Sequence, residues 1–144
     1  MRRIALVLAI AALPACSVKV RTGPLPADNV PAVFEGAWKG TGTQSDNPGT
    51  HWTIALTLAD GAVGEVIGTI TYPSLACGGD LILRQANGGE VELLERITFG
   101  NCLDGGIVRI TNDRRHAGLG YAWRQQGGPL TAEGELARAQ PPAS

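Results

Sequence analysis

Short apolar runs separated by glycine-rich breaks fill the sequence after residue 34, and they restrict the fold more than any other feature. Apolar residues recur at every second position, for example at Trp52, Ile54, Leu56 and Leu58, which is the period of a strand with one buried face. Twenty glycines and only two phenylalanines argue against a helical bundle. The pattern predicts an all-β domain of about eight strands with almost no helix, at residues 38–44, 52–58, 66–72, 81–83, 91–99, 107–111, 119–125 and 130–136.

The breaks between the runs indicate how the strands connect. The sequences NGG, DGG and QGG are short enough for hairpins, and their glycines tolerate the positive φ that such turns need. Consecutive strands should therefore be neighbours. Because an open meander would expose long edges, we expect residues 34–138 to close into a small antiparallel up-and-down barrel, with a two-sheet β sandwich as the alternative. The opening Gly36, Trp38 and Gly40 resembles the start of lipocalin-type and avidin-type barrels.

The first residues indicate an export signal. Arg2 and Arg3 precede an apolar stretch at residues 4–13, which is too short to cross a bilayer, since crossing takes about 20 residues. The sequence Leu13-Pro14-Ala15-Cys16 then resembles the lipobox of bacterial lipoproteins, with a proline where the family usually has a small or aliphatic residue. The resemblance implies that residues 1–15 are a cleaved signal peptide. It also implies that Cys16 carries acyl chains such as palmitate and holds the protein at a membrane. The alternative is an ordinary secretory signal that leaves Cys16 as a free thiol.

Two proline-bearing segments flank the expected domain. Residues 16–33 contain three prolines and no strand or helix period, so we expect a semi-extended tether, and residues 139–144 should form a disordered tail. Ser17 follows the lipobox cysteine. By the sorting rule of the lipoprotein family, a serine there permits passage to the outer membrane. We therefore expect a lipid-anchored protein of the bacterial cell envelope, on the outer membrane facing the periplasm if the source is Gram-negative.

The other two cysteines are expected to form a disulfide bond. The chain has three cysteines, and with Cys16 lipidated, Cys77 and Cys102 remain as partners in an oxidising compartment. Closing the loop between them would contribute roughly 3 to 4 kcal/mol. A metal site is disfavoured because no CxxC motif or histidine pair is present to complete a tetrahedron.

Four stretches around this cysteine pair resemble a small β domain of exported bacterial proteins. They are GAWKGTGTQ, GEVIGTITYPSLACGGDLIL, VELLERITFGNCLDGGIVRI and GYAWR, and together they extend over residues 36–124. The same domain is found at the extracellular ends of some actinobacterial serine/threonine kinases. The resemblance implies a sensory or binding module with one disulfide bond, and it implies no particular ligand.

Charge and motifs argue against several function classes. The formal net charge is −1, and it becomes −3 if Arg2 and Arg3 are cleaved off, so no basic field is available for nucleic acid. The sequence contains no P-loop, dinucleotide fingerprint, HExxH motif or calcium loop, and no nucleophile elbow surrounds Ser45 or Ser74. We therefore expect no enzyme activity and no cofactor. The basic turn at residues 112–118 is interpreted as a solvated hairpin tip, with contact to a phosphate, a lipid headgroup or an acidic partner as the alternative.

Glu95 breaks the expected pattern of the strand at residues 91–99. It shares the inward face with Val91, Leu93, Ile97 and Phe99, and burying an unpaired carboxylate is costly. Three structural explanations are open: a bulge turns Glu95 outward, or it forms an ion pair with an arginine, or it accepts a tyrosine hydrogen bond. The arginines considered are Arg84, Arg109 and Arg124, and the tyrosines are Tyr72 and Tyr121. The functional hypothesis is that Glu95 orients a ligand inside a barrel lined by Trp52, Tyr72, Tyr121 and Trp123, with Trp38 in the core.

Taken together, these observations predict a lipid-anchored envelope protein that binds a small molecule or another envelope component. The first alternative is a protein-interaction or inhibitor-type lipoprotein that acts through its loops. The second is an enzyme.

Overall fold

The computed structural model describes residues 23–113 and 115–140 of the chain. The predicted signal peptide and lipobox, with Cys16, lie outside the described residues. The described part is almost entirely β-structure, as expected, with two three-residue 3-10 helices. Neither of these helices approaches the length or apolar character of a membrane-spanning helix. The elements are β1 (Pro26–Ala27), η1 (Ala32–Phe34), β2 (Gly36–Gln44), β3 (Asn47–Leu58), β4 (Val66–Tyr72), η2 (Pro73–Leu75), β5 (Cys77–Asn87), β6 (Glu90–Phe99), β7 (Ile107–Thr111), β8 (Leu119–Arg124) and β9 (Thr131–Arg138).

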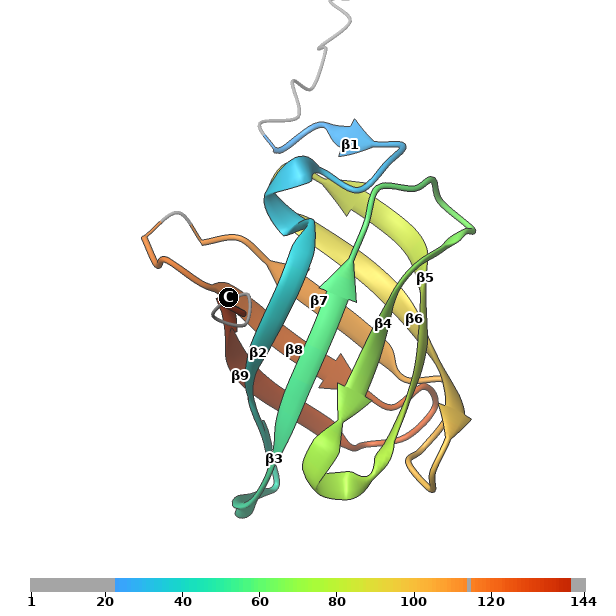
Figure 1. Cartoon of the computed structure of the whole chain (residues 1–144), viewed down its shortest axis with the longest axis vertical. Helices are drawn as coiled ribbons and strands as arrows, with labels where there is room; N and C mark the ends of the chain where they lie inside the picture. Colours follow the sequence, from blue (N-terminus) through green and yellow to red (C-terminus); the bar gives the residue numbers. More distant parts are fainter. Residues whose placement is uncertain (1–22, 114, 141–144) are drawn as a thin grey trace, which may run out of the picture.

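The nine strands form one antiparallel sheet, and the eight longer strands form a near-closed ring (Figure 1). Each strand from β2 to β8 pairs with its successor in sequence, and β9 returns to pair with β2. The up-and-down order expected from the short glycine-rich breaks is therefore confirmed. The sandwich alternative is not supported, because the pairing continues through a single sheet.

The core lies inside the ring. Every second residue of the strands points inward, so that Trp38, Ile54, Leu56 and Leu93 are almost fully buried, while Lys39 and Thr53, on the opposite faces of β2 and β3, are exposed. Trp38 is 4% exposed and forms part of this core, as expected. The alternation in the sequence is thus the alternation between the interior and the exterior of the ring.

One end of the ring, here called the closed end, is covered by the chain that precedes β2. Phe34 in η1 is fully buried, and its backbone carbonyl oxygen accepts a hydrogen bond from Trp38 Nε1 at 2.9 Å. Ahead of it, β1 pairs with β5, and the Val30 backbone N–H donates to the Gly61 carbonyl oxygen at 3.1 Å. Figure 1 shows β1 and η1 together at this end.

This packing corrects the predicted tether, which extended to residue 33. From Pro26 onward the segment belongs to the folded domain, because β1 pairs with β5 and Val30 buries its apolar side chain. Proline is compatible with β1, since an edge strand can lack one backbone donor. The domain therefore begins earlier than residue 34.

The disulfide bond between Cys77 and Cys102 is confirmed. The two Cα atoms are 5.9 Å apart, and the bond closes a sequence separation of 25 residues. It ties the loop that follows β6 to the start of β5. Gly100 in this loop has a φ of +78° and lies directly against Cys77, where a Cβ atom would collide with the cysteine. The loop is therefore held at the end of the ring opposite η1.

The closed end generates a stability prediction. We expect Phe34→Ala to lower the free energy of unfolding by about 3–5 kcal/mol, because it removes a fully buried aromatic ring and leaves a cavity. Leu25→Ala, in the same segment but at a side chain that is 84% exposed, should change stability by less than about 0.5 kcal/mol. Denaturant unfolding measures both. Equal, small effects would mean that the segment before β2 contributes nothing to the fold.

Candidate functional site

A pocket of about 410 Å³ opens at the end of the ring opposite η1, here called the open end. Its walls come from six strands (β2, β3, β4, β6, β8 and β9), from η2, from the loop that carries Cys102 and from the turn before β9. Apolar and aromatic side chains make up most of the lining. The lining residues are Gln44, Thr50, Trp52, Tyr72, Leu75, Glu95, Asn101, Cys102, Leu103, Tyr121, Trp123, Leu130, Thr131 and Ala132.

The structure brings all five residues of the sequence-based ligand hypothesis into this one pocket. Trp52 comes from β3, Tyr72 from β4, Glu95 from β6, and Tyr121 and Trp123 from β8. In sequence they are distributed over residues 52–123, and the ring brings their side chains together at one pocket. The two tyrosines and Glu95 are almost fully buried, while both tryptophans are half-buried.

Glu95 points inward, as the period of two predicted. Its side chain is 1% exposed, so the alternative in which a bulge turns it outward is wrong. An irregularity does occur further along β6, where the register with β5 shifts between Gly78 and Gly79. On the two sides of this shift the expected burial fails: Ile97, before it, is only half-buried, and Phe99, after it, is 51% exposed.

Hydrogen bonds rather than an ion pair hold the Glu95 carboxylate. Tyr72 Oη donates to Oε1 at 2.6 Å, and Trp123 Nε1 donates to Oε2 at 2.9 Å. The hydroxyl oxygens of Tyr72 and Tyr121 are 3.0 Å apart. Because a tyrosine has one O–H group and that of Tyr72 goes to Glu95, Tyr121 is the donor of this last bond. Tyr121 and Tyr72 thus form a chain of two donors that ends on Oε1, and Trp123 donates separately to Oε2.

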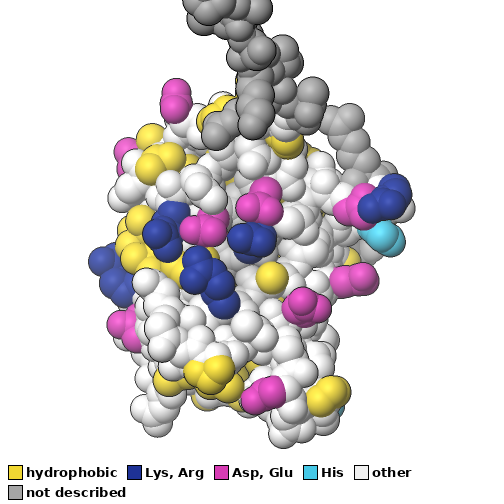
Figure 2. Space-filling view, turned by 180° about the vertical axis from the view of Figure 1, so that it is seen from behind, with side chains coloured by type: hydrophobic (Ala, Val, Ile, Leu, Met, Phe, Trp, Pro, Cys, Tyr) yellow, Lys and Arg dark blue, Asp and Glu magenta, His cyan; other side chains and the backbone are white. Residues whose placement is uncertain are grey.

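Two of the arginines considered as partners of Glu95 lie on the outside of the ring instead. Arg84 contacts Glu92 at 3.6 Å, and Arg109 contacts Glu90 at 3.4 Å and Glu92 at 3.9 Å. Figure 2 shows Lys and Arg side chains interspersed with Asp and Glu on the outer face seen from behind. Among the residues that the structure describes, Glu95 has no cation within ion-pair distance. Its charge is therefore compensated by neutral donors alone.

Burial sets the acid–base properties of the pocket. It raises the pKa of Glu95 above the ordinary value of 4.5, and the nearby negative charge of Asp104 raises it further. The hydrogen bonds from Tyr72 and Trp123 stabilise the carboxylate and lower this pKa in part. Burial also raises the pKa of Tyr72 and of Tyr121 well above 10, so both hydroxyls keep their protons at neutral pH.

Two glycines provide the space in which the tryptophans lie. A Cβ atom on Gly106 would collide with the indole of Trp123, and one on Gly42 would come within 3.0 Å of Trp52 Nε1. The DGG break was interpreted only as a turn, so the role of Gly106 was missed. Gly42 lies directly across from Trp52 in the register of β2 and β3, so the absence of a side chain there leaves room for the indole.

The loop at residues 100–106 is fixed by its backbone and by Asp104. The Glu95 backbone N–H donates to the Gly106 carbonyl oxygen at 2.8 Å, and the Gly105 N–H donates back to the Glu95 carbonyl oxygen at 3.1 Å. Asp104 Oδ1 accepts from the Ile97 backbone N–H at 2.8 Å. Asp104 therefore organises a turn, and the described residues contain no cluster of three or more potential metal ligands.

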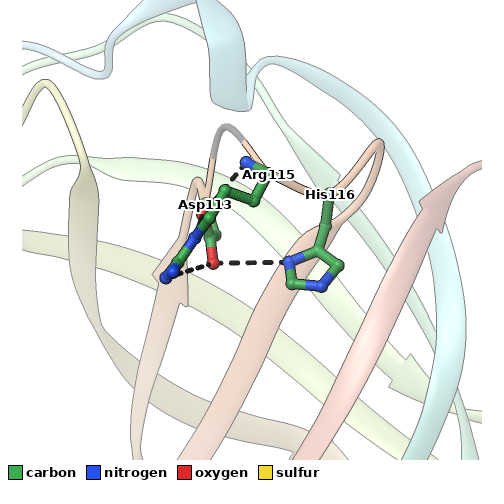
Figure 3. A network of polar contacts seen from close by, with 3 residues as sticks. All are labelled: Asp113, Arg115 and His116. Atoms are coloured by element: carbon green, nitrogen blue, oxygen red, sulfur yellow. Dashed lines mark hydrogen bonds and ion pairs between the residues drawn. The ribbon is translucent and has the colours of Figure 1, made fainter.

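The turn at residues 112–118 is the other group of polar residues considered from the sequence. Asp113 contacts Arg115 Nε at 3.1 Å and His116 Nδ1 at 3.3 Å (Figure 3). The hydrogen bonds from Arg115 lower the pKa of Asp113 to about 2. Arg115 is thus already paired within its own turn, and its side chain is 87% exposed. This geometry favours the interpretation as a solvated hairpin tip.

Comparison of the sequence with protein-family models and with curated proteins gave no match in either case.

The raised pKa of Glu95 predicts a pH dependence of stability. Because the folded state binds this proton more tightly than the unfolded state, the contribution of Glu95 is present at acid pH. It is lost as the pH rises from 4.5 through the raised pKa. Glu95→Gln has no such titration, so its free energy of unfolding, relative to that of the wild type, should increase with pH across this interval and then level off.

Denaturant unfolding at a series of pH values measures this difference. Tyr72→Phe provides a check on the sign: it removes a hydrogen bond that lowers the pKa of Glu95, so the interval should extend to higher pH. Parallel pH profiles for wild type and Glu95→Gln would contradict the burial of an ionisable carboxylate.

Gly106→Ala tests the position of Trp123. The added methyl group should displace the indole, weaken its hydrogen bond to Glu95 and lower the free energy of unfolding by about 1–3 kcal/mol. The indole N–H resonance of Trp123 in an NMR spectrum reports the displacement. Gly88→Ala is the matched control, because nothing lies within 4 Å of the position of its Cβ atom. An unchanged Trp123 resonance in Gly106→Ala would contradict the packing.

Proposed function

We propose that this protein is a lipid-anchored cell-envelope protein that binds a small molecule in the open end of a small up-and-down β-barrel. The observation that carries the proposal is the convergence of four aromatic side chains and one buried carboxylate on a single pocket. A volume of about 410 Å³ is within the range of small-molecule sites, which are roughly 300–1,000 Å³. Mostly apolar walls with a few convergent polar groups are typical of such sites.

The rim of the pocket supports a binding role. Leu75 and Leu103 line the pocket and are each 49% exposed. An apolar side chain gains free energy when a ligand removes it from water, at roughly 25 cal/mol per Å². A hydrogen-bond network with only a structural role would not require exposed apolar side chains at the opening of the pocket. The rim therefore favours a pocket that is filled by another molecule.

The arrangement of Glu95 favours binding over catalysis. Both of its oxygens already accept a hydrogen bond, from Tyr72 and from Trp123. These donors fix the carboxylate in one orientation, which is the property of a group that positions a ligand. We propose no catalytic step and no cofactor.

The proposed location combines two features. The disulfide bond is the form that cysteines take in oxidising, extracytoplasmic compartments. The lipobox-like sequence that ends at Cys16 supplies the proposed anchor, since several acyl chains together bind a membrane stably. On this proposal the domain lies in the cell envelope, joined to the lipid by the residues between Cys16 and Pro26.

A bound small molecule is the direct test. In native mass spectra of the protein purified from its own membranes, we expect an additional small mass that leaves on collisional activation. Trp52→Ala should reduce its occupancy several-fold, because it removes a pocket wall. Val66→Ala, an exposed apolar residue outside the pocket lining, should leave it unchanged. A co-purifying protein without any small mass would contradict the proposal and favour an interaction protein that acts through its loops.

The anchor is tested separately. Cys16→Ser should move the protein from the membrane fraction to the soluble fraction and leave its thermal unfolding unchanged. Ser17→Ala, which keeps the cysteine, should remain with the membranes. Membrane retention of Cys16→Ser, detected by immunoblotting of both fractions, would overturn the lipoprotein proposal without affecting the pocket.

A further inference from the structure

The charge of the pocket lining restricts the ligand. None of the lining residues is a lysine, an arginine or a histidine, and Glu95 is the one carboxylate among them. It is also the most buried polar residue of the lining, with 1% exposure. Charges interact more strongly in such a low-dielectric environment than in water. An anionic ligand would be repelled by Glu95, whereas a cationic ligand would be attracted.

The hydrogen-bonding capacity of Glu95 is not used up by the protein. A carboxylate has about four acceptor positions on its two oxygens. One hydrogen bond to each oxygen is present, from Tyr72 and from Trp123. Further acceptor positions therefore remain on the Glu95 carboxylate. They can accept a hydrogen bond from an N–H or O–H group of a ligand. A charged N–H donor makes the stronger hydrogen bond to a carboxylate.

The aromatic walls of the pocket also favour a cationic ligand. Trp52, Tyr72, Tyr121 and Trp123 all line the pocket with Glu95. The faces of aromatic rings carry partial negative charge and attract cations within about 6 Å of the ring centre, tryptophan most strongly. The one charged side chain of the lining and its four aromatic rings thus both favour a cation over an anion.

We infer that the ligand is a small organic cation, a protonated amine with an apolar body, whose ammonium group lies at Glu95 among the aromatic side chains. This inference rests on the proposed function and assigns its ligand class. The apolar body of the amine lies toward Leu75 and Leu103 at the rim. A fatty acid or another carboxylate of the same size should bind more weakly, because its charge is repelled by Glu95.

Three probes of nearly the same shape test the charge preference: 2-phenylethylamine, 2-phenylethanol and 3-phenylpropionate. They are titrated into the purified protein, and the NMR resonances of the indole N–H groups are followed. The chain has three tryptophans. Trp52 and Trp123 line the pocket, while Trp38, bonded to the Phe34 carbonyl oxygen at the closed end, serves as an internal reference.

We expect the amine to shift the Trp52 and Trp123 resonances with a Kd at least about tenfold below that of the alcohol, and the carboxylate to bind weakest. Glu95→Gln should bring the Kd of the amine to within about threefold of that of the alcohol. Glu92→Gln removes an almost equally buried carboxylate from the outer face of the same strand, and it should leave the preference intact.

The outcomes separate the two proposals. If the alcohol or the carboxylate shifts both tryptophans as strongly as the amine does, the cation inference is overturned and small-molecule binding stands. If no probe shifts either resonance at millimolar concentration, both proposals fall. The comparison of the three probes is made on the wild-type protein, so it does not depend on any variant being folded. For Glu95→Gln, an unchanged Trp38 resonance shows that the variant is folded.

Discussion

The pairing of β2 with β9 is the interaction on which the rest of the structure depends. It joins the first and the last strand of the ring over seven residue pairs, from Trp38 with Arg138 to Gln44 with Ala132. Two glycines allow this close approach, because a Cβ atom on Gly40 or on Gly134 would collide with the backbone of the opposite strand. At the closed end, Arg138 lies over the ring of Trp38, 4.3 Å from its centre.

This seam also builds the pocket. β3 follows β2 on one side of it and β8 precedes β9 on the other, so closure brings Trp52 and Trp123 to the same end of the molecule. An open meander would place them far apart at two sheet edges. The core and the site therefore share one cause, and the site is a property of the ring rather than of any one loop.

The sequence predicts the features that follow from the alternation of apolar and polar residues. It does not predict features that depend on irregular segments, on register shifts or on contacts between distant strands. The strands and the inward direction of Glu95 follow from alternation, because one face of each strand must be buried. The pairing of β1 and the burial of Val30 do not follow from the sequence, because an irregular, proline-bearing segment has no period. The exposure of Phe99 was missed because a register shift ends the alternation. The two side chains that donate to Glu95 are Tyr72, 23 residues earlier in the chain, and Trp123, 28 residues later. Only the ring brings these two side chains to Glu95.

The two ends of the ring have different structural roles. Phe34 and Trp38 hold the closed end, whereas the rim at Leu75, Asn101 and Leu103 is carried by a short helix and by a loop that the disulfide bond fixes from outside the sheet. Substitutions at the rim therefore touch neither the seam nor the core. Substitutions at Leu75, Asn101 or Leu103 would therefore change the size and polarity of the opening while leaving the pairing of β2 with β9 in place.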